Sequence, residues 1–221
     1  TFGQCRASNY LPLLRKALDA AGCEDVPILS FSTLDGQTPS GFDIDRKKLT
    51  QKLFLTLIFA DALARLYLAT VARERSAGEA TRVHAAYLER MEEGLAQGRF
   101  SVMLRLLREA VAAFNAVPVH DRPLPMIGVL GEIFVKHNAF SNHHLVSWLV
   151  ERGVEVVTPS LAGFFLQHFI NEDFNRRAAL RRMAGAERLT LALLDPLIRF
   201  RLRQVEAVLE GFRYKIGRAH V

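Results

Sequence analysis

Two short apolar runs separated by one helix's length of chain constrain the fold of this protein more than any other feature. The first run, Met126–Leu130, is typical of a buried strand and is followed at once by Gly131 and a polar loop. A helix is expected over about His143–Arg152, and the second run, Val154–Val157, has the pattern of the next strand. Crossovers of this kind join parallel strands and are almost always right-handed. The pattern therefore predicts a parallel β–α–β unit.

Helical patterns dominate the rest of the chain. Apolar spacing predicts a helix over Tyr10–Ala21, and Val26–Phe31 has the pattern of a short strand after it. Three consecutive helices are expected between residues 43 and 116, and helices alone over Leu161–Arg213. We predict an α/β fold, with Rossmann-like parallel βα units, a large helical insertion and a helical C-terminal segment.

The same patterns divide the chain into four segments. Residues 1–33 are expected to end a first α/β domain, 34–117 to form a helical connection or insertion, and 118–215 to form a second, incomplete α/β domain with helices. The last six residues, Ile216–Val221, match an in-frame translation of a widely used sequencing adapter, so we exclude them from reasoning about fold and function. We expect the sequence to be a fragment of a longer protein.

Charge narrows the possible partners. The formal net charge of +6 is modest, and 24% charged residues is ordinary for a globular protein. Four arginines between residues 176 and 182 form the densest basic cluster, but no aromatic side chains alternate with them, as base stacking would need. We therefore expect a solvated helix face there and no nucleic-acid partner.

Cysteine content and hydropathy bear on location. The two cysteines, Cys5 and Cys23, do not make a disulfide framework in 221 residues, which favours a reducing, cytoplasmic compartment. The most apolar stretch, Leu53–Leu68, is interrupted by Asp61 and Arg65. We expect it to be a buried helix and expect no membrane partner.

The first candidate site surrounds Cys5. This residue lies just ahead of the first expected helix, where amide N–H groups and the helix dipole favour a thiolate, and Arg6 adds positive charge. A thiolate is the ligand that an iron–sulfur cluster needs. An isolated cysteine is more often inert packing, so the local residues leave both interpretations open.

The second candidate site is the polar loop that follows Met126–Leu130. Open parallel sheets bind ligands beyond the carboxyl ends of their strands. Polar groups in this loop come from Glu132, Lys136, Asn138 and Asn142. Lys136 could pair with a phosphate or carboxylate. A surface loop whose asparagines cap the following helix explains the same residues equally well.

Two segments, taken together, resemble one family. Gly3–Leu18, which begins Gly-Gln-Cys-Arg-Ala-Ser-Asn-Tyr, is similar to the Gly-Gly-Cys-Arg-Ala-Ser-Asn-Tyr segment of activase-related proteins of the 2-hydroxyacyl-CoA dehydratase superfamily. Gly131–Val146, Gly-Glu-Ile-Phe-Val-Lys-His-Asn-Ala-Phe-Ser-Asn-His-His-Leu-Val, is similar to that family's Gly-Glu-Ile-Tyr-Val-Lys-x-Asn-x-Phe-x-Asn-x-His-Leu-Val segment. The matches follow the family's order and cover about Gly3–Phe31 and Arg122–Pro159.

This resemblance implies two Rossmann-like domains with helical additions and an iron–sulfur cluster held between them by cysteines. ATP would bind only to an activase domain, upstream or on a partner, which delivers a low-potential electron to the cluster protein. Dehydratase members then remove water from a 2-hydroxyacyl-CoA through a ketyl radical, and relatives include ATP-dependent reductases. The motifs do not imply that activase-related members dehydrate a substrate, and they assign no catalytic residue here.

The resemblance also assigns roles to residues. Cys5 would be a metal ligand, and Arg6, Ser8 and Asn9 would shape the first helical turn around the cluster. The loop facing the cluster would be lined by Glu132, Lys136, Asn138 and Asn142. Gln4 replaces the family's second glycine. A cubane normally uses about four cysteines and only Cys5 suits the site, so the other ligands would lie outside this sequence and the fragment alone should be inactive.

Three functions follow as alternatives. The first is an iron–sulfur component of low-potential electron transfer to CoA thioesters, either a dehydratase-like lyase or part of an ATP-dependent reductase. The second is a non-catalytic scaffold or interaction module that binds the activase. The third, a helical regulatory protein with a basic surface for nucleic acid, is weakened by the missing aromatic residues.

Overall fold

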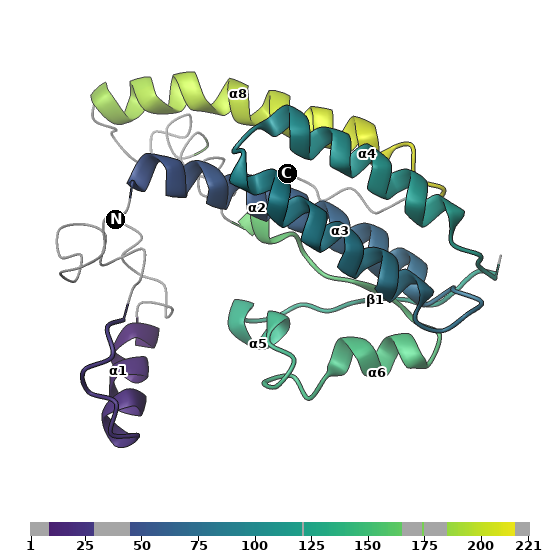
Figure 1. Ribbon diagram of the computed structural model, residues 1–221, viewed down its shortest axis with the longest axis horizontal. Helices are drawn as coiled ribbons and strands as arrows, with labels where there is room; N and C mark the ends of the chain where they lie inside the picture. The colour runs from purple at the N-terminus through teal and green to yellow at the C-terminus, as the bar shows by residue number, and fades with distance from the viewer. Residues whose placement is uncertain (1–8, 29–44, 121, 165–173, 175–184, 215–221) are drawn as a thin grey trace. The chain divides into compact units, whose positions relative to one another are not determined.

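The computed structural model describes residues 9–28, 45–120, 122–164, 174 and 185–214 (Figure 1). Contacts between residues divide the chain into two compact units, Thr1–Thr50 and Gln51–Val221.

The first unit contains helix α1, Tyr10–Ala20, which agrees with the helix expected there. Gly22, at φ 68°, ends the helix in a Schellman motif, because the N–H of Cys23 donates to the carbonyl of Leu18 at 2.9 Å. Of the strand expected over Val26–Phe31, residues 26–28 form no strand and residues 29–31 lie outside the described part.

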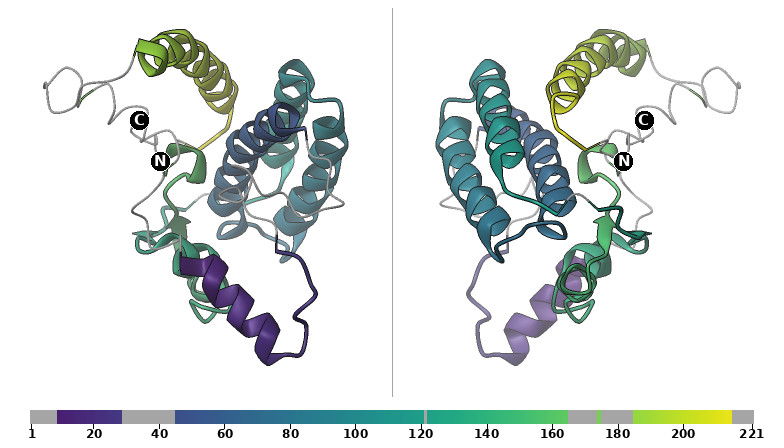
Figure 2. Two further views of the ribbon diagram at one scale, coloured as in Figure 1. Left: turned by 90° about the vertical axis from the view of Figure 1, so that its left-hand side faces the viewer. Right: turned by 90° about the vertical axis from the view of Figure 1, so that its right-hand side faces the viewer.

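The second unit is built on four long helices. They are α2 (Arg46–Val71, which begins in the first unit), α3 (Glu79–Ala96), α4 (Phe100–Ala116) and α8 (Gly185–Leu209). Helices α2, α3 and α4 lie side by side, and α8 runs along α4 (Figures 1 and 2). Glu74 fixes the turn before α3 by accepting from the amides of Gly78 at 2.7 Å and Ala80 at 2.6 Å.

One hydrophobic core joins these helices. Its fully buried side chains include Phe59, Leu63 and Leu66 of α2 and Met103, Leu107 and Phe114 of α4. Val205 and Leu209 of α8 are buried in the same cluster. The main core of the second unit is therefore helix against helix.

Within α2, Lys48–Val71 is long and apolar enough to cross a membrane, judged by length and composition alone. The mean hydropathy of its most apolar 18-residue window is 1.7, and 44% of that window is buried inside the protein. Helices at the centre of a helical core have the same composition, and the packing of Phe59, Leu63 and Leu66 explains the apolar sequence.

A small βα lobe, residues 126–157, completes the second unit. It contains strand β1 (Met126–Gly128), helix α5 (Ile133–His137), helix α6 (Leu145–Glu151) and strand β2 (Glu155–Val157). The strands pair in parallel, with Met126 opposite Glu155. The expected β–α–β unit is therefore present. Its own core is small, with Val129, Leu149 and Val156 as the buried side chains.

The predicted Rossmann-like α/β fold is wrong. The described residues are mostly helical, and their sheet consists of β1 and β2 alone. A Rossmann-like sheet has more strands and helices on both faces, whereas Met126 and Ile127, which point to opposite faces of β1, are 59% and 41% exposed. The helices assigned to an insertion instead bury most of the apolar surface and form the principal core.

Candidate functional site

The loop after β1 lies beyond the carboxyl ends of the two parallel strands, as expected. Gly131 turns the chain there with φ 148°, a backbone conformation that favours glycine. Glu132 then begins α5, and its side chain accepts a hydrogen bond from the Val135 amide at 3.0 Å. The Glu132 carboxylate therefore caps a helix.

The two asparagines of this loop brace it from within. Asn138 accepts from the Ser141 amide at 3.0 Å. The Asn142 side chain donates to the carbonyls of Val135 at 3.0 Å and Lys136 at 3.1 Å. Asn142 also accepts from the Leu145 amide at 3.2 Å. These contacts agree with the alternative that the asparagines are structural.

Lys136 and His137 supply the remaining polar groups at the end of α5. Lys136 is half-buried and His137 is exposed. Partial burial of the ring and the positive charge of Lys136 lower the pKa of His137, while the carboxylate of Asp61 acts in the opposite direction. The imidazole therefore tends to be neutral, and Lys136 is the cation that this loop offers to an anion.

Two consecutive histidines hold the loop in an uncommon backbone conformation. His143 and His144 have φ values of 54° and 56°, which non-glycine residues seldom adopt. The His144 amide donates to the carbonyl of Ala139 at 2.7 Å, and the Asn142 contacts fix the chain on either side. Local hydrogen bonds therefore stabilise this strained conformation. Because His143 and His144 are not helical, α6 begins only at Leu145.

The residues around the predicted thiolate are only partly described. Cys5, Arg6 and Ser8 lie outside the described residues. Asn9 precedes α1 and is exposed, and its side chain makes no capping hydrogen bond. Cys5 and the loop after β1 belong to different units, so their predicted proximity stays a prediction. Among the described residues, no group of three or more His, Cys, Asp or Glu side chains could hold a metal ion.

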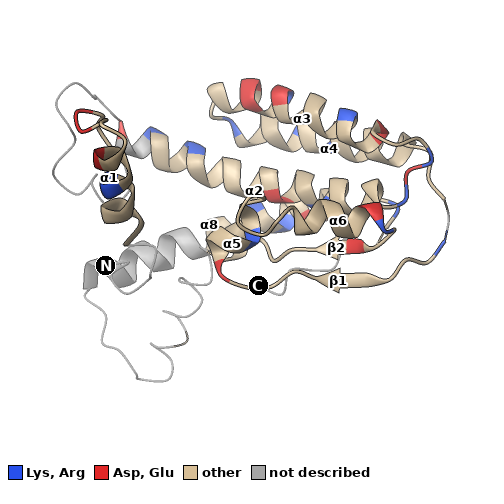
Figure 3. Cartoon of the chain, turned by 90° about the horizontal axis from the view of Figure 1, so that it is seen from below, with Lys and Arg blue, Asp and Glu red and all other residues tan. Residues whose placement is uncertain are grey.

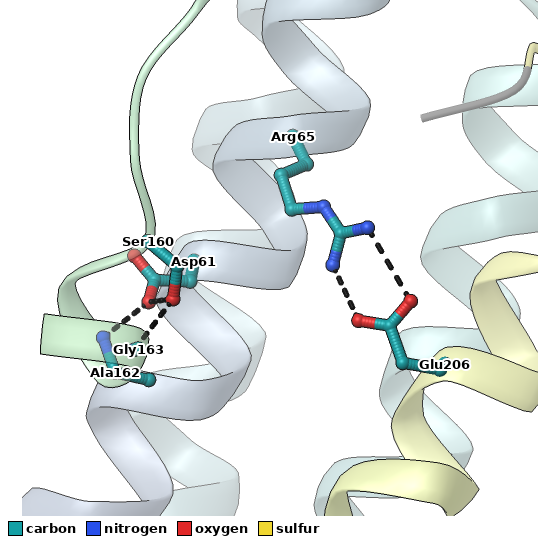
Figure 4. Close-up of polar contacts among 6 residues, drawn as sticks. All are labelled: Asp61, Arg65, Ser160, Ala162, Gly163 and Glu206. Atoms are coloured by element: carbon teal, nitrogen blue, oxygen red, sulfur yellow. Dashed lines mark hydrogen bonds and ion pairs between the residues drawn. The ribbon is translucent and has the colours of Figure 1, made fainter. Parts of the chain in front are cut away.

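Polar contacts inside the second unit were missed by the sequence reasoning. Asp61, on α2, accepts from the Ser160 hydroxyl at 2.7 Å and from the Ala162 amide at 2.6 Å (Figure 4). It also accepts from the Leu161 amide at 3.1 Å. Arg65, one turn later, donates to both carboxylate oxygens of Glu206 at 2.7 and 3.4 Å. A signal was present, because charged residues within an apolar helix need partners.

A buried ion pair ties the βα lobe to the helices. Arg73 follows α2, and its guanidinium lies 2.5 Å from the carboxylate of Glu155 on β2, with both side chains almost fully buried. It also donates to the carbonyl of Ala69 at 2.8 Å and stacks on the ring of Tyr214 at 4.5 Å. The partners of these charges lie within the fold, which indicates a structural role.

No protein family, curated protein or solved structure matches the chain.

Proposed function

We propose that this chain is part of an iron–sulfur protein related to the 2-hydroxyacyl-CoA dehydratases, and that Cys5 supplies one thiolate ligand. The cluster would carry low-potential electrons, received from an ATP-dependent activase and used on a CoA thioester. Two cysteines in 221 residues are too few for a disulfide framework, which supports a reducing, cytoplasmic compartment.

One structural observation supports this proposal above others. The second motif forms an ordered, internally braced loop at the carboxyl ends of two parallel strands, where α/β proteins commonly bind ligands. In it Glu132 and Asn142 hold the backbone, so the motif's polar residues position the loop and Lys136 remains to meet an anionic group.

The described residues do not fit a complete cluster. They contain one cysteine, Cys23, whose exposed thiol lies 3.7 Å from the carbonyl of Ala21. With Cys5, the chain has two thiols, fewer than the roughly four that a cubane takes. No reaction step is therefore assigned to this chain, whose part would be to contribute a ligand and a positioned loop.

The test compares Cys5→Ser with Cys23→Ser in the complete protein, purified without oxygen. We expect Cys5→Ser to lower bound iron and sulfide and to change the EPR spectrum of the reduced protein, because thiolate ligation is lost while the helical circular dichroism is kept. Cys23→Ser, the matched control, should leave the bound iron and sulfide and the EPR spectrum unchanged. Equal iron content in the two variants would exclude Cys5 as a ligand. Reconstitution of a full cluster on the 221-residue chain alone would contradict the single-ligand role.

A second candidate, the non-catalytic interaction module, is favoured by the surface of the βα lobe. Leu130, Phe140 and Trp148 are 76%, 88% and 49% exposed, and large apolar side chains left in solvent are candidates for contact with a partner. Phe140→Ser should then weaken binding to the activase in a pull-down of the two purified proteins and leave iron content unchanged. If Phe140→Ser binds the activase as well as the unaltered protein, this surface does not carry the interaction.

A further inference from the structure

An open groove of about 470 Å³ runs between α4 and α8, on the helical part of the second unit. Its apolar lining comes from Leu104 and Val111 of α4, both 6% exposed, and from Val208 of α8, which is half-buried. Its hollow comes from Ala207 and Gly211, which have little or no side chain to fill it. The volume is within the range of small-molecule sites.

The far end of the groove is fixed in place. Asn115, near the end of α4, donates to the Gly211 carbonyl at 2.9 Å and accepts from the Arg213 amide at 2.9 Å. These two bonds join the last turn of α4 to the chain that follows α8. The spacing of the two groove walls is therefore built into the fold and does not depend on a bound molecule.

The two polar side chains that line the groove, Arg108 and Gln204, both present donors. The guanidinium of Arg108 is exposed and makes no ion pair or side-chain hydrogen bond among the described residues. The Oε1 atom of Gln204 accepts from Arg201 at 3.3 Å, so its Nε2 hydrogens are the groups left for a ligand. None of the described residues that line the groove carries a carboxylate.

We infer that this groove binds a small aliphatic molecule with an anionic head group. A carboxylate can accept from Arg108 and Gln204 together, and charge-assisted bonds of this kind are stronger than neutral ones. The aliphatic tail lies along Leu104, Val111 and Val208. Leu104 and Val111 are seven residues apart on α4, about 10 Å at 1.5 Å per residue, which suits a chain of medium length.

The surroundings favour the same sign of charge. Among the described residues that line the groove, Arg108 is the one charged side chain, and the whole chain carries +6. An anion is therefore attracted to this side of the protein, and a cation with the same tail is repelled. This inference does not depend on Cys5 or on iron.

The test is calorimetric titration of the chain with decanoate, with decanol and decyltrimethylammonium as neutral and cationic probes. Decanoate should bind at one site and more tightly than either. Arg108→Gln should weaken decanoate about tenfold, a typical effect of losing a charge-assisted bond, and leave decanol unchanged. Ala207→Leu should weaken decanoate and decanol alike, because the added side chain fills the groove. Arg105→Gln, an exposed arginine of the same helix outside the lining, is the matched control and should bind as the unaltered chain does.

Several results would overturn the inference. One is no saturable decanoate binding up to millimolar concentration by a chain with its full helical signal. Another is an equal effect of Arg108→Gln and Arg105→Gln. Gel filtration showing a dimer that Ala207→Leu dissociates would assign the groove to a second copy. Dodecanoate should displace decanoate from the groove. If an acidic amphipathic peptide binds the groove more tightly than decanoate does, the groove belongs to a partner helix instead.

Discussion

Changing either Arg73 or Glu155 alone should lower the free energy of unfolding by a large amount, because the other charge then stays buried without its partner. The two side chains are 9% and 8% exposed and lie 2.5 Å apart. Glu155→Gln keeps the shape and removes the negative charge, so Arg73 stays buried without its counter-ion. Breaking such a pair costs roughly 3–5 kcal/mol. Arg73 keeps the Ala69 carbonyl and the Tyr214 ring, which places the expected loss near the lower end, about 3 kcal/mol.

Urea unfolding followed by circular dichroism measures this loss. With a urea dependence of about 2 kcal/mol per molar, the midpoint should fall by about 1.5 M. Replacing both partners with apolar residues, Arg73→Met with Glu155→Leu, should recover most of the stability, because no buried charge remains. The control is Arg82→Gln, whose guanidinium is 77% exposed and 3.9 Å from Glu79, and which should cost no more than about 0.5 kcal/mol. A loss for Glu155→Gln as small as that of the control would refute the reasoning.

Three further predictions concern other contacts. Asp61→Ala should destabilise the second unit by about 2 kcal/mol in the same assay, because the Ser160 hydroxyl and two backbone amides lose their acceptor. Asn142→Ala should speed hydrogen exchange of the Leu145 amide while changing overall stability far less; unchanged exchange would mean the brace is unimportant. Burial lowers the pKa of His84 from its ordinary value near 6.5. As the pH falls below about 6.5, the unfolded state therefore binds a proton before the folded state does, and the free energy of unfolding decreases. His84→Gln should flatten that part of the stability curve, and an equally steep curve would count against the assignment.

Local periodicity predicted the helices well but not what they pack against. The expected helix over Tyr10–Ala21 and the β–α–β unit are both present, because each depends on residues close in sequence. The fold class was wrong because it depended on how many strands join β1 and β2 in space. Periodicity gives an apolar face but not its partner, so helices that pack on a sheet and helices that pack on each other look alike in sequence.

The site shows the same limit. The sequence placed the polar loop correctly at the end of β1, since a strand followed by glycine and polar residues is a local signal. It left open whether Asn138 and Asn142 face a ligand or the loop itself, and both side chains form hydrogen bonds within the loop. The helix expected from His143 begins only at Leu145, because local hydrogen bonds hold both histidines at positive φ.

In the view of Figure 3, β1 is the outer strand of the pair and carries no charged residue, while β2 lies between β1 and the helices. Two contacts join the β2 side to the helical core: Glu155 binds Arg73, and the segment after β2 binds Asp61. Both charges are within or next to α2, which contains a long apolar stretch, and each would be costly there without a partner. Asp61 and Arg73 therefore help to fix the position of the lobe relative to the helices, and the loop after β1 depends on them for its place although it contains neither. Changes at Asp61 or Arg73 should for this reason alter any function of the loop.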